Sequence, residues 1–267
     1  MSEKKFLIVE MRGVSKHFGG VQALSDAWLD VYTGEVHALV GDNAAGKSTL
    51  IKILSGAVPR DEGTISFEGS KVEIDSPRAA KDLGIETVYQ DLALADNLDV
   101  ASNIFLGREL TLNGALKPFL DLRRMEEESR RLLARLKINI PSIRQKVRSM
   151  SGGQRQSIAI ARSVYFNAKV VILDEPTAAL GVEETRKVHD LVREMRSHGL
   201  AVLMISHNIN HVFENSDRIT VMKTGRVVGS RRIEETSKDE ILRMIVTGSA
   251  EMRAAQAAPE PQQAVAG

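Results

Sequence analysis

The sequence contains no cysteine and only one tryptophan in 267 residues, and aromatic residues make up 4% of it. A chain without cysteine has no disulfide, zinc finger, iron–sulfur cluster or thiol nucleophile. Its longest uninterrupted apolar stretch is Leu200–Ile205, far short of the ~18 residues that cross a bilayer. The charged start Met1–Lys5 does not resemble a signal peptide. We therefore expect a soluble, cytoplasmic protein that reaches a membrane only by docking onto something already there.

The charges nearly cancel, because 36 Lys and Arg residues face 35 Asp and Glu residues, for a formal net charge of +1. Nucleic-acid binders usually carry a basic domain or stripe, so this balance argues against a nucleic-acid partner. Disordered chains combine few apolar residues with a high net charge, whereas hydrophobic residues make up 43% here. Length and composition favour one α/β domain with an inserted subdomain.

Strand-like segments alternate with helix-like ones, which predicts an α/β fold. Short strands are expected at Phe6–Val9 (an edge strand), Ala27–Val31, Glu35–Val40 and, as a hairpin, Gly63–Glu68 and Lys71–Ile74. The continuous apolar runs Val170–Leu173 and Ala201–Ile205 are typical of strands buried on both faces of a parallel sheet.

Helices are expected at Thr49–Leu54, Asp99–Glu109, Arg123–Leu136, Gly152–Phe166 and Glu183–Ser197. A short helix begins at Ser76-Pro77, with the serine as N-cap and the proline at the first helical position. The dense charges of Arg123–Leu136 predict a solvated helix face. From Ala250 the composition shifts to Ala, Gln and Pro, which predicts a folded domain over residues 1–249 and a disordered tail over 250–267.

The first motif that carries chemistry is a phosphate-binding loop of the pattern G-x4-G-K-[ST]. It consists of Gly41, Asp42, Asn43, Ala44, Ala45, Gly46, Lys47 and Ser48. Its inward-pointing amides and the start of the following helix at Thr49 attract an anion. Lys47 would reach the β- and γ-phosphates, and the Ser48 hydroxyl would bind Mg²⁺. The alternative is a glycine-containing turn that matches by chance, and the strand–loop–helix context argues against it.

Two carboxylates, Asp174 and Glu175, directly follow the buried strand Val170–Leu173. In a P-loop fold, an acidic residue at the tip of a neighbouring strand lies beside the Mg²⁺, so Asp174 is predicted to hold it, through water. Glu175 is expected to orient and deprotonate the attacking water. By itself an Asp-Glu pair after a strand would be an ordinary turn, and it gains its meaning from the P-loop.

The third motif is Ser151, Gly152, Gly153 and Gln154 at the start of a predicted helix, which makes a second anion site with no phosphate of its own nearby. With Ala161-Arg162 and Leu173–Thr177, this block resembles the signature-to-Walker-B segment of ATP-binding-cassette (ABC) ATPases. The resemblance covers about residues 7 to 248.

Three more positions match that family. Gln90 falls at the place of its Q-loop glutamine, His207 at that of its switch histidine, and Phe18 at that of its adenine-stacking aromatic. The resemblance implies ATP and Mg²⁺ as cofactors, with Gln90 joining Ser48 and Asp174 at the metal. It implies that His207 hydrogen-bonds the γ-phosphate, so that Glu175, His207 and Gln90 form the catalytic set.

The resemblance also implies an architecture: a P-loop NTPase fold of the ABC ATPase type, with an antiparallel β subdomain and an inserted α-helical subdomain at about residues 91–165. Two chains would pair head to tail as a homodimer. Each ATP would lie between Gly41–Thr49 and Phe18 of one chain and Ser151–Gln154 of the other. ATP binding would close the dimer and hydrolysis would open it.

Three departures from the family pattern stand out. Ala44 replaces a common glycine, at a modest cost unless its φ is positive, so we expect nucleotide binding to survive. Met150 replaces a leucine, which is a conservative change. Gly181 stands where the D-loop of the family usually carries an aspartate. The missing aspartate side chain removes a contact across the dimer.

Further stretches look like the ATPases of bacterial monosaccharide importers of the ribose, xylose and fructose class. They are Thr177–Val182, Ala101–Glu109, and Ser76-Pro77 before Leu83-Gly84-Ile85. The chain has room for one cassette, like the single-cassette members associated with fructose-like uptake. The resemblance implies transmembrane permease subunits and a periplasmic or extracellular sugar-binding protein as partners, and a peripheral place on the cytoplasmic face of the inner membrane. The permease would contact a groove near Gln90 and residues 91–103, for which ordinary helix packing is the alternative.

Other functions stay open. The same ATPase could serve another solute, such as an amino acid or inositol. A non-transport ABC ATPase acting on ribosomes or DNA usually has a second cassette with a charged linker, or a long coiled-coil insert, and this sequence has neither. A P-loop kinase or GTPase would not explain Ser151–Gln154 or His207. His207 and His211 could bind a metal from one helix face, but His207 already has a role.

Overall fold

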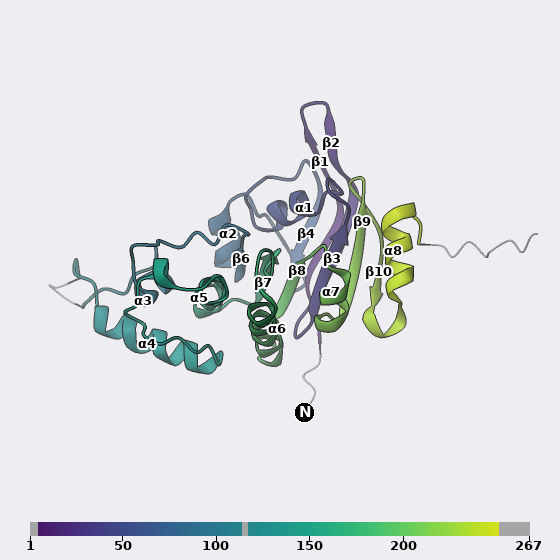
Figure 1. Ribbon diagram of the computed structural model, residues 1–267. Coiled ribbons are helices and arrows are strands. Elements are labelled where there is room, and N and C mark those ends of the chain that lie inside the picture. Colours follow the sequence, from purple (N-terminus) through teal and green to yellow (C-terminus); the bar gives the residue numbers. More distant parts are fainter. Residues whose placement is uncertain (1–4, 114–116, 251–267) are drawn as a thin grey trace, which may run out of the picture.

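The computed structural model describes residues 5–113 and 117–250, which form two β-sheets and the helices around them (Figure 1). The antiparallel sheet has the order β2-β1-β4-β5 and the larger sheet the order β10-β9-β3-β8-β7-β6. The antiparallel sheet contains β1 (Leu7–Phe18), β2 (Val21–Tyr32), β4 (Glu62–Phe67) and β5 (Ser70–Val72). The larger sheet contains β3 (Val36–Gly41), β6 (Ile85–Val88), β7 (Val170–Asp174), β8 (Ala201–Ile205), β9 (Arg218–Lys223) and β10 (Arg226–Arg232).

The α-helices of the described residues are α1 (Lys47–Leu54), α2 (Pro77–Asp82), α3 (Val100–Ile104), α4 (Leu122–Arg135), α5 (Gly152–Tyr165), α6 (Val182–Ser197), α7 (Ile209–Asn215) and α8 (Lys238–Thr247). Short 3-10 helices cover Val147–Ser149 and Ile233–Glu235. Helices α3, α4 and α5 lie together at one end of the molecule, and α8 lies at the other (Figure 1). No helix of the described part is long and apolar enough to cross a membrane.

The core follows from the two-residue period of the buried strands. In β3, Leu39 packs into the cluster that holds β1, β2 and α1, whereas Ala38 and Val40 pack against α7 and α8. In β7, Ile172 faces the first cluster, and Leu173 packs with the helices α3 to α6. The larger sheet is therefore covered on both faces, as the apolar runs predicted.

The prediction for the first strand is wrong in length and in position. β1 has 12 residues, and it pairs with both β2 and β4, so it is not an edge strand. Its register shifts between Met11 and Val14, where Gly13 has a φ of 63°. This irregularity interrupts the alternation on which the prediction relied. β2 likewise starts at Val21 rather than at Ala27.

The helix predicted at Asp99–Glu109 ends early. α3 stops at Ile104 and is capped by Phe105, and the chain turns at Gly107 with a φ of 80°. Its start is as expected, because the Asp99 side chain accepts a hydrogen bond from the Ser102 amide. The predicted hairpin is confirmed by the pairing of Phe67 with Ser70. The predicted tail lies, apart from Ala250, outside the described residues.

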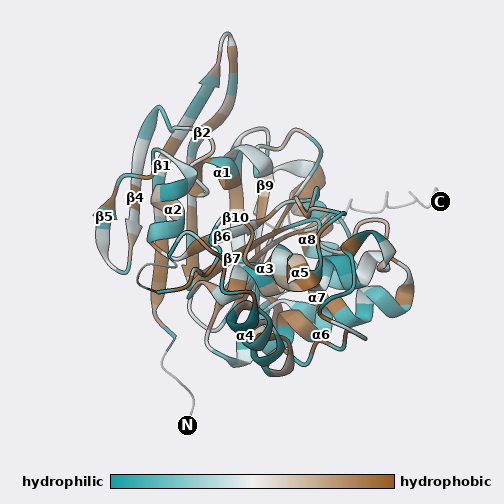
Figure 2. Ribbon diagram, turned by 90° about the vertical axis from the view of Figure 1, so that its left-hand side faces the viewer, coloured by the Kyte–Doolittle hydropathy of each residue, from teal (hydrophilic) through white to brown (hydrophobic). Residues whose placement is uncertain are grey.

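The charged face predicted on α4 is confirmed. Figure 2 shows that this helix is mostly hydrophilic. Its charged side chains pair along the helix, with Arg130 bonded to Glu126 and Arg131 to Glu128. Its other face buries Met125, Ser129, Leu132 and Leu133.

The strand order brings the predicted site together. β3, β8, β7 and β6 are parallel neighbours, so the segments that follow them emerge at one edge of the sheet. That edge receives Gly41 from β3, His207 after β8, Glu175 after β7 and Gln90 after β6. One expectation needs correction: the strand that carries Asp174 is not hydrogen-bonded to the P-loop strand, because β8 lies between them.

Candidate functional site

The P-loop connects β3 to α1, and two of its glycines are fixed by close backbone contacts. Gly46 is the N-cap of α1 with a φ of 97°, and a Cβ there would lie 2.9 Å from the Ala23 carbonyl oxygen. Gly41 has a φ of 151°, and a Cβ there would lie 2.2 Å from the Met222 carbonyl oxygen. Only glycine fits these positions.

Ala44 meets the condition under which its substitution for glycine is costly. Its φ is 64°, in the left-handed region. A residue with a Cβ pays roughly 1–2 kcal/mol for that conformation. The loop therefore holds a strained alanine where glycine would be free of strain.

Lys47 folds back over its own loop. Its Nζ donates hydrogen bonds to the carbonyl oxygens of Gly41 at 2.7 Å and Asp42 at 2.9 Å. Burial lowers the pKa of Lys47, while the charges of Glu175, Asp42 and Asp174 oppose that shift. The ammonium group thus lies at the edge of the sheet among carboxylates, and within the described residues its hydrogen-bond acceptors are both backbone carbonyls.

Glu175 and His207 are bonded to each other. The His207 Nδ1 lies 2.8 Å from the Glu175 Oε2, with 75% of the His207 side chain and 20% of the Glu175 side chain exposed. Glu175 adopts a left-handed φ of 51°, and its amide donates to the Ile205 carbonyl at 3.1 Å. This backbone bond places the residue after β7 beside the loop after β8. The two side chains for which separate roles are expected are thus in contact with each other.

Asp174 is the last residue of β7 and lies half-buried at the edge of the large sheet that holds the P-loop. Burial raises the pKa of Asp174, and the neighbouring charge of Glu175 raises it further. A nearby cation would favour the charged carboxylate and so oppose both effects. The described residues hold no cluster of three or more His, Cys, Asp or Glu side chains that could bind a metal alone. A magnesium site here would therefore combine Asp174 with the oxygens of Ser48, Gln90 and a nucleotide.

Gln90 is exposed just beyond β6, and its surroundings are held by residues whose part in the site the sequence did not reveal. The Tyr89 hydroxyl donates to Ser55 Oγ at 3.2 Å. The Arg162 guanidinium on α5 donates to the carbonyls of Leu92 at 3.1 Å and Ala93 at 2.9 Å. In the sequence, Arg162 belongs to the Ala161-Arg162 pair of the family block, and that pair was the signal that could have pointed to a role for it. In the structure, Arg162 lies on α5 between the buried residues Ala161 and Ser163.

The turn Ser151–Gln154, called the signature turn below, opens α5 as predicted. The Ser151 Oγ accepts from the Gln154 amide at 3.3 Å, and Gln154 Oε1 accepts from the Ser151 amide at 3.1 Å. This reciprocal pair is a capping box. Among the hydrogen bonds of residues 5–113 and 117–250, none joins this turn to Gly41–Thr49.

The remaining side chains that the sequence singled out are those of Phe18 and of the two histidines His207 and His211. Phe18 ends β1 with 49% of its surface exposed, and Lys16 Nζ lies 5.6 Å from its ring centroid. His211 packs against His189, with ring centroids 5.0 Å apart, whereas His207 contacts Glu175. The two histidines therefore point to different partners, which removes the support for a shared metal site.

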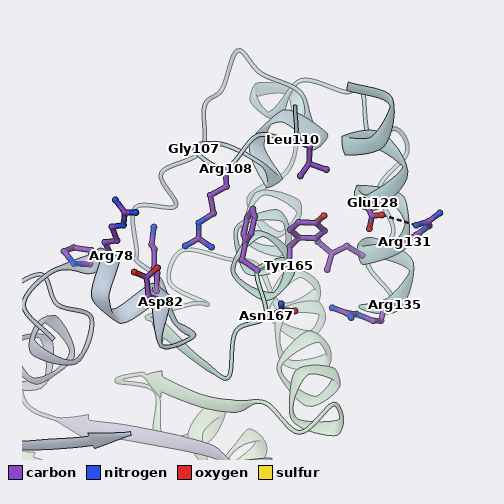
Figure 3. A pocket seen from close by; sticks show the side chains of 14 residues that line it. Arg78, Asp82, Gly107, Arg108, Leu110, Glu128, Arg131, Arg135, Tyr165 and Asn167 are labelled. Carbon is purple, nitrogen blue, oxygen red and sulfur yellow. Dashed lines mark hydrogen bonds and ion pairs between the residues drawn. The ribbon is translucent and has the colours of Figure 1, made fainter. Parts of the chain in front are cut away.

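A hollow with a cavity volume of about 1270 Å³ lies between α2, α4 and the end of α5, away from the P-loop (Figure 3). Basic side chains line it from two helices, Arg78 and Lys81 from α2 and Arg131 and Arg135 from α4. Tyr165 adds an aromatic surface (Figure 3). Its basic side chains favour a negatively charged group.

Known protein families, sequences and structures similar to this chain agree with the fold described above. The family model described as ABC transporter matches residues 24–178. A xylose/arabinose import ATP-binding protein of Sulfolobus acidocaldarius is 50% identical over 240 residues, 90% of this chain and 94% of the relative. A fructose import ATP-binding protein of Rhizobium meliloti is 49% identical over 223 residues, 82% of this chain and 86% of the relative.

A ribose import ATP-binding protein of Rubrobacter xylanophilus is 42% identical over 239 residues, which are 90% of this chain but 47% of the relative. Among solved structures, the ADP conformation of an ATP-binding cassette of an ABC transporter matches with a TM-score of 0.75. It is 25% identical, and the match covers 90% of this chain and 95% of that one. The predicted P-loop fold and the predicted resemblance are confirmed.

Proposed function

The chain belongs to the ABC transporter family, and we propose that it is the ATP-hydrolysing subunit of an importer that takes up a monosaccharide. The observation that carries the proposal is the edge of the large sheet, where the P-loop, Asp174, Glu175, His207 and Gln90 emerge from neighbouring strands. The relatives at 49% and 50% identity are named for the import of fructose and of xylose or arabinose. Those names support a sugar as the solute.

The loop Gly41–Thr49 binds the phosphates of ATP, and Phe18 stacks on the adenine. Lys47 moves from the carbonyls of Gly41 and Asp42 to the β- and γ-phosphates, because a charged oxygen is a stronger acceptor than a neutral carbonyl. The left-handed backbone at Ala44 is retained in this cradle, since it aims the neighbouring amides inward.

Ser48, Asp174 and Gln90 offer the oxygen ligands that Mg²⁺ prefers. When bound, the ion neutralises charge that develops on the phosphates during transfer. The raised pKa of Asp174, caused by burial and then by Glu175, supports this assignment, since a carboxylate in such surroundings is stabilised by a cation.

Glu175 orients the attacking water and takes its proton, and His207 donates a hydrogen bond to the γ-phosphate. In the structure these two side chains are bonded to each other, with His207 Nδ1 2.8 Å from Glu175 Oε2. This bond must open for both to reach their substrates. The high exposure of His207 makes it the one that moves.

A homodimer completes the site. The signature turn of a second chain supplies Ser151, Gly152, Gly153 and Gln154 to the γ-phosphate, head to tail, so that two ATP molecules lie between two subunits. The lack of hydrogen bonds between this turn and the P-loop of the same chain, among the described residues, supports a site made in trans. ATP then favours the closed dimer by differential binding, and hydrolysis removes that preference.

Transmembrane permease subunits would dock on the hollow of Figure 3 and on the exposed loop after Gln90. Arg78, Lys81, Arg131 and Arg135 favour a docking segment that carries acidic side chains. Within the stretch 91–103, the helix α3 buries Val100, Ala101 and Asn103 for packing, so the contact belongs to the loop 91–97 before it.

A separate periplasmic or extracellular sugar-binding protein would select the solute, and this subunit would work as a peripheral protein on the cytoplasmic face of the inner membrane. Cells that lack the gene allow a direct test, with uptake of labelled fructose, xylose, arabinose and ribose measured after complementation. We expect one uptake to be lost and to be restored by the wild type and by Glu183→Gln, but not by Glu175→Gln.

If no sugar uptake changes but uptake of an amino acid or of inositol is lost, the ATPase serves the alternative solute. If no uptake of any solute changes while the purified chain still hydrolyses ATP, the transport proposal is wrong and a non-transport role takes its place.

A further inference from the structure

The first turns of α5 and α6 pack against each other at the signature turn. Gly153 has no room for a side chain, since a Cβ there would lie 2.8 Å from the Cβ and 3.0 Å from the Cγ of Glu184. Leu180 covers the neighbouring Gly152, whose added Cβ would lie 3.1 Å from Leu180 Cδ2. The side chain of Glu184 therefore lies directly on the helix start that the proposed dimer offers to the γ-phosphate.

The Glu184 carboxylate lies between the starts of α5 and α6. Its Oε2 accepts from the Gly181 amide at 3.3 Å. The pKa of Glu184 is lowered, first by hydrogen bonding from the Ser151 hydroxyl, then from the amides of Gly181 and Gly153. At neutral pH the group is thus an anion that rests on the N-terminal turn of α5, which is the place where such a turn attracts negative charge.

Capping α5 does not require this carboxylate. The capping box of Ser151 and Gln154 already satisfies the Gln154 and Ser151 amides. The Ser151 Oγ is an acceptor in that box, so its single hydrogen remains for one acceptor outside the helix. The Glu184 side chain packs against Gly153, and its carboxylate lies within reach of that hydrogen, since Ser151 is the largest cause of its lowered pKa.

We propose that Glu184 acts as an internal substitute for the γ-phosphate: it occupies the signature turn in the free subunit and must release Ser151 and Gly153 before the partner's ATP can bind them. This inference rests on the proposed head-to-tail dimer. A hydroxyl cannot donate one hydrogen to two acceptors, and a carboxylate repels a phosphate placed beside it. Glu184 is therefore a positioning residue that sets the ATP concentration at which the dimer closes.

The same contact ties closure to α6. Glu184 links the signature turn to Gly181, the N-cap of α6, where the chain has no capping side chain of its own. When ATP displaces Glu184 from Ser151, the start of α6 and the loop before it lose a contact with α5. The glycine at position 181 thus has a replacement partner within the chain.

Glu184→Gln tests the proposal in the Glu175→Gln background, where hydrolysis does not reopen the dimer. The amide keeps an oxygen for Gly181 and removes the charge. We measure dimer formation by light scattering as ATP–Mg²⁺ is increased. We expect half-maximal dimerisation at about tenfold less ATP, since a hydrogen bond to a charged group contributes enough for a change of that size. ATP affinity of the monomer, measured at protein concentrations below dimerisation, should stay unchanged.

Glu183→Gln is the matched control, because it removes the same charge one residue away, where Glu183 pairs only with the exposed Arg186 among the described residues. It should leave the ATP concentration for dimerisation within about twofold. Glu184→Ala is the second variant. It should lower the melting temperature through loss of the α6 contact, and it should also lower the ATP concentration needed for dimerisation. Weaker folding together with easier dimerisation is a combination that a merely structural role would not give.

An unchanged or raised ATP requirement in both Glu184 variants would overturn the proposal, as would an equal shift in Glu183→Gln. These outcomes leave the proposed function intact if Glu175→Gln alone forms the ATP-dependent dimer. If Glu175→Gln alone stays monomeric in saturating ATP–Mg²⁺, the head-to-tail site fails, and the role of Glu184 fails with it.

Discussion

Two helices of this chain, α1 and α5, start at glycine-bearing turns that suit an anion. The charged side chains beside these two turns have opposite signs. α1 starts after Gly46, which provides no side-chain cap, and the nearby Lys47 ammonium is bonded to carbonyls of the loop. α5 starts after Ser151 with a complete capping box, and the carboxylate of Glu184 rests on it. In the described part of the chain, no carboxylate is bonded to the amides of the first turn or to Lys47, whereas the second already has a negative charge beside it.

The difference separates a site that receives its ligand from one that must be vacated first. A phosphate at the P-loop gains the charge of Lys47 and amides to which no side chain is bonded among residues 5–113 and 117–250. A phosphate at the signature turn must replace an intramolecular hydrogen bond and overcome a like charge. ATP would therefore bind to the P-loop of one subunit first, and the second subunit would engage only when the gain exceeds the cost of moving Glu184.

The largest effect is expected from removing the cation of the first turn. Lys47→Ala should weaken ATP binding at least about 100-fold, because it deletes charge-assisted hydrogen bonds to two phosphates. Isothermal titration calorimetry measures the affinity, and Lys71→Ala, an exposed lysine on β5, is the control. Affinity within a few-fold of the wild type would remove Lys47 from the phosphate site.

Glu175→Gln should slow hydrolysis about 10²–10⁴-fold, since it removes the general base but keeps the side chain's shape. ATP binding at the P-loop should persist, and the dimer should accumulate. Phosphate release measures the rate and light scattering the dimer. A rate close to that of the wild type would assign the base to another residue.

Asp174→Asn sharpens the contrast in the nucleotide-free state. The pKa of Asp174 is raised in the folded chain, so the folded state holds a proton over a pH range in which the unfolded chain has lost it. Stability therefore falls as pH rises through that range. We expect the Asp174→Asn substitution at neutral pH to raise the melting temperature by about 2–4 °C, the shift that ~1 kcal/mol gives in a chain of this size.

The pH series supplies the check on that substitution. Below the ordinary aspartate pKa both states are protonated, so the difference between the two proteins should vanish there. Scanning calorimetry across the series tests the sign, and a gain that persists unchanged at low pH would point to packing rather than to the charge.

The smallest effect is expected at Ala44. Ala44→Gly should raise the free energy of unfolding by about 1 kcal/mol or less, because glycine adopts the φ of 64° without strain but gains entropy when unfolded. Chemical denaturation measures it. Ala45→Gly should instead destabilise the chain, since Ala45 is 2% exposed and does not have a positive φ.

Local patterns predicted much of this molecule. The glycines, Lys47 and Ser48 of the P-loop are spaced along a continuous stretch, so their chemistry could be predicted without knowing the fold. The buried strands β7 and β8 were predicted for the same reason, because their side chains are apolar on both faces. The predictions failed where local regularity breaks, as at the shifted register of β1 and at the early end of α3.

Several site features depend on contacts between distant parts of the chain. Arg162 holds the loop after Gln90 across 69 or 70 residues of sequence. The bond between Glu175 and His207 exists because β7 and β8 are in a register that pairs Asp174 with Ile205. No spacing of residue types along the chain contains either contact.

The sequence by itself determined the phosphate-binding loop, the alternation of strands and helices, and the family, because these depend on residues that are close together along the chain or on an ordered set of motifs. Only the tertiary structure decided that β8 separates the P-loop strand from Asp174 and that Glu184 rests on the signature turn. Sheet order and helix packing are set by the burial of the whole apolar surface at once, so the partners of a charged side chain follow from the complete fold.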